Sequence, residues 1–224
     1  MPFAWPSLVV TLVATLLGFA LGWWPLAAWA ERSMKSERMP RPSLRSLRLA
    51  SAITTAGVFG LLALRFGLTW ILPALLAFAA CATVLSIVDL AEKRLPNAVV
   101  FPALGAVAVL LVPATWATGH WMSLVWALVG SAAMFAVYFV LALISPAAMG
   151  MGDVKLALVI GLLLGWFGMS AWLVGLLAAF VVGGVIALVA LALKRVTLRG
   201  SIPFGPSMLV GALVAVVLVG PPVG

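Results

Sequence analysis

Only a few side chains in this sequence can take part in acid–base or nucleophilic chemistry. The acidic residues are Glu31, Glu37, Asp89, Glu92 and Asp153. The three glutamates lie among arginines and lysines, where we expect solvated ion pairs that contribute little to stability. The two aspartates instead border long apolar segments, and they are the candidates for catalysis.

Asp89 ends one apolar segment and Asp153 directly precedes another. Ionisable groups at membrane depth are costly and therefore point to function. Two carboxylates a few ångströms apart share a proton, so one can act as a base toward water while the other donates a proton to a carbonyl oxygen. The alternative is that each aspartate only caps a helix end, as Asp153 would at a helix N-terminus.

Glycines precede the second aspartate, in the sequence Gly150-Met151-Gly152-Asp153. Glycine permits backbone conformations that are closed to other residues. A helix from Asp153 to a turn near Gly168 would be roughly 22 Å long, shorter than the ~30 Å hydrocarbon core. We therefore expect the glycine-containing loop to dip into the membrane face. Lys155 either anchors this segment at the cytoplasmic surface or orients the substrate and biases the pKa of Asp153.

The remaining reactive groups argue against other kinds of site. Cys81 is the only cysteine and His120 the only histidine, so neither a disulfide framework nor a Cys/His metal site is expected. We place His120 in an outer loop, which leaves the serines without a histidine on their side and argues against a serine triad. The sequence predicts no metal and no cofactor.

The composition identifies the elements that must hold the two aspartates. Apolar residues make up 66% of the 224 residues and charged residues 8%, against about 45–50% and about 25% in soluble proteins. The apolar stretches are continuous and lack the alternation of barrel strands. The sequence therefore predicts an all-α integral membrane protein, a polytopic bundle of about eight transmembrane helices in a single membrane domain, residues 1–224.

The apolar segments and the turns that interrupt them define the predicted spans. The first covers residues 3–30, a basic cytoplasmic connector covers 31–48, and the helical core covers 49–219. Blocks 49–90 and 154–193 are twice the ~20 residues that one span needs, so we split them near Arg65-Phe66-Gly67 and near Gly168-Met169-Ser170. The other predicted spans are 98–117, 121–145 and 205–219.

The charge distribution orients this bundle. The formal net charge of +8 comes from 13 Lys+Arg against 5 Asp+Glu, and every basic residue except Arg65 falls in connectors that can share one side. Basic connectors mark the cytoplasmic side. Both termini are therefore expected outside, and both aspartates at the cytoplasmic face of the cell membrane. The same distribution explains the basic excess by topology, so the expected partner is the lipid bilayer and not nucleic acid.

Three segments around these residues resemble the type IV prepilin peptidases, which are GxGD-type membrane aspartic proteases. The segments are Asp89-Leu90-Ala91-Glu92-Lys93-Arg94-Leu95-Pro96-Asn97, Gly150-Met151-Gly152-Asp153-Val154-Lys155-Leu156 and Ile202-Pro203-Phe204-Gly205-Pro206. The resemblance covers roughly residues 70–215. It implies that Asp89 and Asp153 are the catalytic pair and that the enzyme cleaves prepilins or pseudopilins after a glycine. The supporting loop residues it implies are Gly150, Gly152, Lys155, Pro96 and Asn97.

One departure from that family narrows the expected activity. Many prepilin peptidases carry a cytoplasmic domain between their first two helices, often with paired CxxC motifs, which is implicated in N-methylation of the mature pilin. The corresponding connector here spans only Glu31 to Arg48 and contains no cysteine. The chain thus resembles a short form, for which we expect no zinc and predict peptidase activity only.

Two other classes of function stay open from the residues alone. The aspartates could be relay groups of a proton-coupled transporter, although no acid is predicted near the bilayer midplane and no inverted repeat is evident. The chain could also be a non-catalytic membrane scaffold, which would tolerate alanine at both aspartates. The particular pilin-like substrate and the oligomeric state also stay open.

Overall fold

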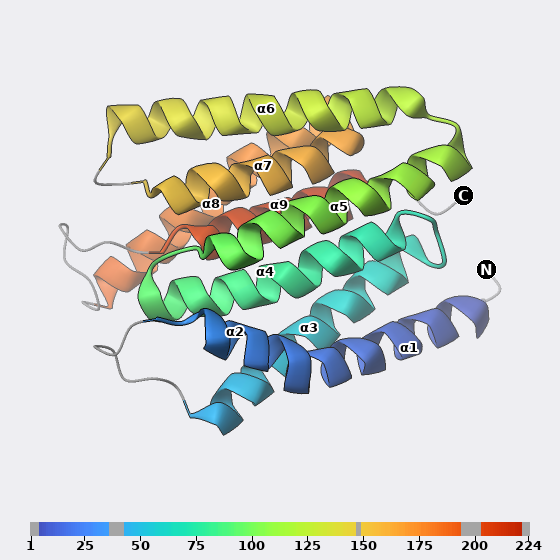
Figure 1. Ribbon diagram of the computed structural model, residues 1–224, viewed down its shortest axis with the longest axis horizontal. Coiled ribbons are helices and arrows are strands. Elements are labelled where there is room, and N and C mark those ends of the chain that lie inside the picture. Colours follow the sequence, from blue (N-terminus) through green and yellow to red (C-terminus); the bar gives the residue numbers. More distant parts are fainter. Residues whose placement is uncertain (1–4, 36–42, 147–148, 194–202, 221–224) are drawn as a thin grey trace.

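The chain folds into a bundle of helices that run roughly along one common direction (Figure 1). The computed structural model describes residues 5–35, 43–146, 149–193 and 203–220, and none of these residues forms a strand. The elements are α1 (Trp5–Leu21), the π-helical turn η1 (Gly22–Leu26), α2 (Ala27–Ser33), α3 (Leu44–Phe66), α4 (Leu72–Glu92), α5 (Asn97–Thr118), α6 (Trp121–Ile144), α7 (Met151–Trp166), α8 (Met169–Ala192) and α9 (Gly205–Val219).

Within the described residues, six segments are long and apolar enough to cross a membrane, which confirms the predicted all-α membrane bundle. The first of them runs without interruption through α1, η1 and α2 as Ser7–Ser33. Counting it as one rod gives eight helical rods in the described part of the chain. The two rods that fall short of a full span are α7, with 16 residues, and α9, with 15.

The N-terminal rod differs in its limits from the predicted first span of residues 3–30. Pro25 lies inside η1, where it lacks the N–H for a regular helical hydrogen bond, and the wider π-turn accommodates it without ending the helix. The rod continues to Ser33, and α3 begins at Leu44. Helices therefore extend into both ends of the predicted connector 31–48, and its residues 36–42, with Glu37, lie outside the described residues.

The two double-length apolar blocks divide where the sequence predicted. Gly67 and Gly168 have φ angles of 58° and 99°, a region of backbone conformation that favours glycine. Gly67 ends α3 and Gly168 separates α7 from α8. Since a helix cannot pass through this backbone conformation, each block becomes an antiparallel pair of helices.

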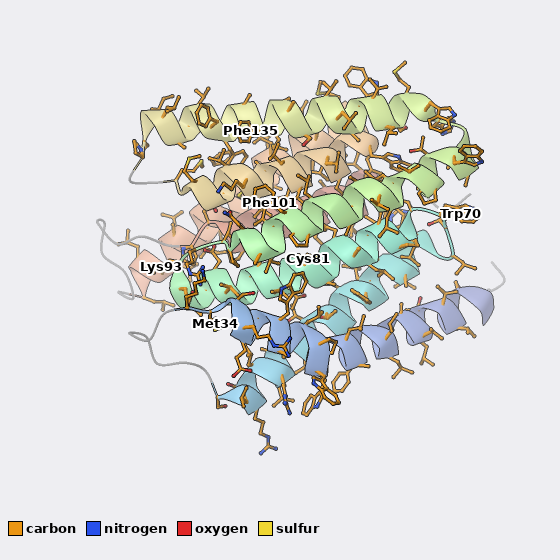
Figure 2. The ribbon with its side chains drawn as sticks, viewed as in Figure 1. Met34, Trp70, Cys81, Lys93, Phe101 and Phe135 are labelled. Carbon is orange, nitrogen blue, oxygen red and sulfur yellow. The ribbon has the colours of Figure 1, made fainter. Side chains whose placement is uncertain are left out.

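The two ends of the bundle have different chemistry. Trp70 lies at one end and Lys93 at the other (Figure 2). The Trp70 end also carries the start of α1 and the end of α9 (Figure 1). Tryptophan is typical of membrane interfaces. Several tryptophans lie at or near helix termini: Trp5, Trp70, Trp116, Trp121, Trp166 and Trp172. The assignment of this end to the outside stays a prediction.

Arg65, the basic residue that the charge pattern left on the outer side, stabilises the end of a helix. Its Nε donates to the carbonyl oxygen of Val217 at 3.0 Å, and its guanidinium also donates to the carbonyl oxygen of Gly220 at 2.5 Å. The last carbonyls of a helix have no partner within it and favour a cation. Arg65 is therefore explained as a cap for α9.

Glycines let two pairs of helices approach closely. A Cβ atom on Gly18 would lie 2.8 Å from the carbonyl oxygen of Thr55 on α3. On α7, a Cβ on Gly161 would lie 2.6 Å from the Cβ of Met134 on α6. Small residues at such crossings permit backbone contact between membrane helices, so α1 packs against α3 and α7 against α6.

Two helices, α4 and α7, form the interior of the bundle. The run of α7 from Val154 to Gly165 is buried almost throughout, since α5, α6, α8 and α9 all contact it. Helix α4 contacts α2, α3, α5 and α9. The two aspartates thus belong to helices that are surrounded by other helices of the bundle.

Candidate active site

Asp89 lies in the last turn of α4 and is only 4% exposed. Its Oδ2 accepts a hydrogen bond from the backbone N–H of Gly205, the first residue of α9, at 3.1 Å. A Cβ atom at position 205 would lie 2.7 Å from that same oxygen, so the contact requires glycine. The N-terminus of α9 thus supplies a positive dipole end and a backbone donor to a buried carboxylate.

The chain leaves α4 through an unusual backbone conformation at Lys93. Its φ and ψ angles of 53° and 41° are left-handed, and its N–H donates to the carbonyl oxygen of Asp89 at 2.8 Å. Left-handed backbone is uncommon outside glycine and, when present, often marks functional sites. It turns the chain sharply, so that Leu95 becomes buried and Pro96 caps the start of α5.

Arg94 fastens this turn to the first rod. Its Nε pairs with Oε2 of Glu92 at 2.6 Å, and its guanidinium donates to the carbonyl oxygen of Ser33 on α2 at 2.7 Å. The predicted ion pair of Glu92 is present, but the Glu92 side chain is only 4% exposed and not solvated as expected. The ion pair with Arg94 compensates the free-energy cost of removing the Glu92 carboxylate from water.

Asp153 lies in the first turn of α7, because that helix begins at Met151 and not after the aspartate as predicted. Its Oδ2 accepts a hydrogen bond from the N–H of Gly150 at 3.2 Å. The side chain therefore caps the helix N-terminus, which is the role that we considered as the alternative to catalysis. A Cβ on Gly152 would lie 3.0 Å from the Cβ of Leu95. Gly152 therefore allows the start of α7 to pack against the turn after α4.

The two carboxylates line one cavity of ≈ 460 Å³ at this end of the bundle. Its lining residues are Asp89, Lys93, Arg94, Leu95, Gly150, Met151, Gly152 and Asp153. Burial and the neighbouring Asp89 carboxylate raise the pKa of Asp153 to about 6, against the opposing effect of the Gly150 hydrogen bond. A carboxyl group with such a pKa can exchange a proton near neutral pH. The arrangement suits acid–base chemistry on a bound water.

The other predicted supporting residues hold the two halves of the site together from outside the cavity. The Nζ of Lys155 donates to Oδ1 of Asn97 at 3.1 Å and lies 6.0 Å from the centre of the Phe101 ring. Asn97 is the first residue of α5, directly after Pro96. Lys155 therefore links α7 to α5, while Gly150 and Gly152 of the predicted set line the cavity.

Sequence reasoning missed several residues at this site. Lys93 and Arg94 were interpreted as topology signals, yet both line the cavity. Figure 2 shows Lys93 at the end of α4 that faces this cavity. Gly205 belonged to a recognised segment but had no assigned role. Tyr138, the only tyrosine, is 1% exposed and lies 6.3 Å from Phe204, the residue before Gly205, centroid to centroid. Its being the only tyrosine of the chain, within a strongly apolar segment, was the signal that could have drawn attention to it.

No metal-binding cluster is present at the described residues, since they contain no group of three or more His, Cys, Asp or Glu side chains. Cys81 lies in α4 (Figure 2) and is buried. His120 is exposed between α5 and α6. These two residues lie outside the cavity that the aspartates share.

Two curated proteins are similar to this chain over most of its length. It is 27% identical to the prepilin leader peptidase/N-methyltransferase of Bacillus subtilis over 169 residues, which are 74% of this chain and 64% of that protein. It is 29% identical to the protein of the same name from Stutzerimonas stutzeri over 165 residues, 70% of this chain and 53% of that protein. The chain thus spans under two thirds of the length of these relatives. No solved structure matches it significantly.

The family comparison covers the helices that carry both carboxylates. The model of the type IV leader peptidase family matches residues 76–188, half of the chain. This range begins within α4 and ends within α8, so it contains Asp89, Asp153 and the loops around them. The resemblance stated from the sequence motifs is confirmed: this chain belongs to the type IV leader peptidase family.

Proposed function

We propose that this chain is a membrane aspartic endopeptidase that cleaves the basic leader from type IV prepilins or pseudopilins after a glycine. The observation that carries this proposal is the single cavity lined by both Asp89 and Asp153. Membership of the family and the names of the two relatives support the class of substrate.

In the proposed reaction the two carboxyl groups share one proton. The ionised aspartate takes a proton from a water molecule, whose oxygen attacks the carbonyl carbon of the scissile bond. The protonated aspartate donates its proton to the carbonyl oxygen, giving a tetrahedral diol. The C–N bond then breaks as the leaving nitrogen receives a proton, and the carboxyl group of the leader is released. The pair titrates as a unit, so the roles of base and acid are not divided between the residues.

The basic end of the bundle supports a cytoplasmic position for the cavity. Lys93 and Arg94 line it and Lys155 lies beside it, while Arg32 and Arg45 occur near the same end on α2 and α3. Basic residues concentrate on the cytoplasmic side of membrane proteins. A prepilin has a short basic leader before an apolar helix, so its scissile bond would rest at this surface.

We propose the peptidase activity without the N-methyltransferase activity that the names of both relatives include. The reason is the segment between the first two spans. It covers only the residues between Ser33 and Leu44 and contains no cysteine, whereas many prepilin peptidases carry a cytoplasmic domain at this place, often with paired CxxC motifs.

Cleavage of a co-expressed prepilin with a Gly–Phe junction tests the proposal. We expect the wild-type chain to process it, and Asp89→Asn and Asp153→Asn each to lose processing by roughly 100-fold or more. Glu31→Gln, a matched change at an acid on α2, should leave processing unchanged. Continued cleavage by both aspartate variants would refute the mechanism, and proton-dependent solute uptake without any cleavage would favour the transporter.

A further inference from the structure

A second cavity opens on the side of the bundle, between α3 and α9, with α4 as its floor. Its volume is ≈ 450 Å³. Val58 of α3, Ala82 and Ser86 of α4, and Leu209 and Val210 of α9 are among the lining residues. Val210 at its rim is 44% exposed. Because α3 and α4 are apolar spans, we expect this opening to face the hydrocarbon of the bilayer. We call it the α3–α9 groove.

The groove leads to the site that contains Asp89. On α4, Ser86 lies one turn before Asp89. On α9, Leu209 lies one turn after Gly205, whose N–H donates to Asp89 at 3.1 Å. The floor and one wall therefore converge on the contact that holds the catalytic carboxylate. Along α4 the floor runs from Ser86 to Phe78. At a helical rise of about 1.5 Å per residue, this stretch extends about 12 Å into the membrane.

The lining of the groove is more suitable for a polypeptide helix than for lipid chains. Its floor contains the small residues Ala79 and Ala82, and small residues allow membrane helices to approach closely. Thr83 uses its hydroxyl within the protein, donating to the carbonyl oxygen of Ala79 at 3.1 Å. The hydroxyl of Ser86 makes no hydrogen bond to any other described residue. An unpaired hydroxyl is costly in hydrocarbon. The free backbone N–H groups at the start of a neighbouring helix can donate a hydrogen bond to it, whereas an acyl chain offers no partner.

On the basis of the proposed peptidase function, we propose that the α3–α9 groove binds the apolar helix that follows the scissile bond of the substrate. The N-terminal end of that helix lies beside Ser86, and the scissile bond just before it reaches the cavity of Asp89 and Asp153. The leader then stays outside the membrane, at the basic end of the bundle. The apolar helix enters from the bilayer without passing through the protein interior.

Filling the floor of the groove tests this binding mode. In Ala82→Phe the added ring occupies the space where the substrate helix would lie. The matched control is Ala136→Phe on α6, which adds the same ring at an exposed position away from the groove. The first substrate is a membrane-inserted prepilin with a Gly–Phe junction. The second is a soluble peptide with the same leader and junction but without the apolar helix.

We expect Ala82→Phe to lower cleavage of the full prepilin by at least about tenfold, since the scissile bond is no longer positioned, and to spare cleavage of the peptide. Ala136→Phe should cleave both like the wild type. Unchanged cleavage of the prepilin by Ala82→Phe would overturn the binding mode. A wild-type chain that cleaves neither substrate would instead refute the peptidase function, and the groove assignment with it.

Photocrosslinking keeps the inference testable where Ala82→Phe loses all activity. A photoreactive residue is placed at position 210 in the Asp89→Asn variant, and for comparison at position 136. We expect the residue at 210 to capture the apolar helix of the prepilin and the residue at 136 not to capture it. No capture at 210, or equal capture at both positions, would overturn the inference.

Discussion

Helices α7 and α8 come from one continuous apolar block, yet they occupy opposite environments. Almost every residue of α7 from Val154 to Gly165 is buried. Helix α8 is longer, with 24 residues, and buries only Ala171, Gly175 and Ala179. Both helices are apolar in sequence, since Asp153 and Lys155 at the start of α7 are the only charged residues in either. Hydrophobicity therefore identifies a membrane helix without showing whether it faces protein or lipid.

The difference follows from where the small residues lie and what they meet. On α7, Gly161 and Gly165 contact the backbone of α6 while the opposite side meets α5 and α9. On α8, the buried small residues Ala171, Gly175 and Ala179 form a single stripe that faces the bundle, while Leu177 and Val181 are 62% and 64% exposed. The helix that carries Asp153 is thus held from all sides, whereas α8 covers one side of the bundle.

The largest expected effect is the loss of packing around α7. In Gly161→Leu the new side chain collides with Met134, since even a Cβ atom would lie 2.6 Å from the Met134 Cβ. Overpacking of this kind costs about 1–3 kcal/mol or more. We expect lower yield and a lower melting temperature in detergent micelles.

The matched control for this change is Gly184→Leu on α8, where a Cβ atom would meet nothing within 4 Å. Its free energy of unfolding should change by less than about 0.5 kcal/mol. Equal destabilisation by both leucine substitutions would show that α7 and α8 do not differ as described.

A smaller effect is expected where α9 contacts the other interior helix, α4. In Gly205→Ala the added Cβ would lie 2.7 Å from Oδ2 of Asp89, which displaces that carboxylate from its backbone donor. We expect prepilin cleavage to fall about 10- to 100-fold while the yield and melting temperature stay close to wild type. Gly184→Ala should alter neither quantity, and full activity of Gly205→Ala would show that the contact does not position Asp89.

A few-fold effect is expected from the link between α7 and α5. Lys155→Met removes the hydrogen bond to Asn97 that the structure places at 3.1 Å. A single exposed hydrogen bond contributes about 1 kcal/mol, so cleavage should fall by less than about tenfold. In a double-mutant cycle with Asn97→Ala, the second change should add little once the first is made. Fully additive losses would show that the two side chains act separately.

The last effect concerns how stability, and not cleavage, depends on pH. The pKa of Asp153 is raised to about 6 by burial and by Asp89, against about 3.9 in an unfolded chain. The folded protein thus binds this proton more tightly, and its stability should fall as pH rises from about 4 to about 6. Asp153→Asn cannot ionise, so it should melt a few degrees above wild type at pH 7 and like wild type at pH 4. The same melting difference at both pH values would contradict this assignment.

Much of the fold could be predicted because membrane helices obey local rules. Length and apolarity located the spans, and Gly67 and Gly168 located the turns that divide the long blocks. The limits of the helices were less predictable. The sequence alone did not show that Pro25 would be absorbed in a π-turn, or that α7 would begin before Asp153.

The candidate site could be predicted in its residues but not in its construction. Asp89 and Asp153 stood out since acids are rare in apolar sequence, and the motifs around them marked the family. Lys93 and Arg94 were indistinguishable from topology signals until the left-handed turn at Lys93 placed them at the cavity. Gly205 acquires a role only by contact with a residue far away in the chain.

The sequence by itself therefore determined that the chain is a bundle of membrane helices and that two aspartates are its candidate catalysts, because composition and short motifs are local properties. Only the tertiary structure decided which apolar helices are enclosed by protein and which backbone groups hold the carboxylates. It also decided that residues from α4, α7 and α9 meet at one end of the bundle. Such contacts join positions distant in the chain, and they depend on how side chains from several helices fill the same space.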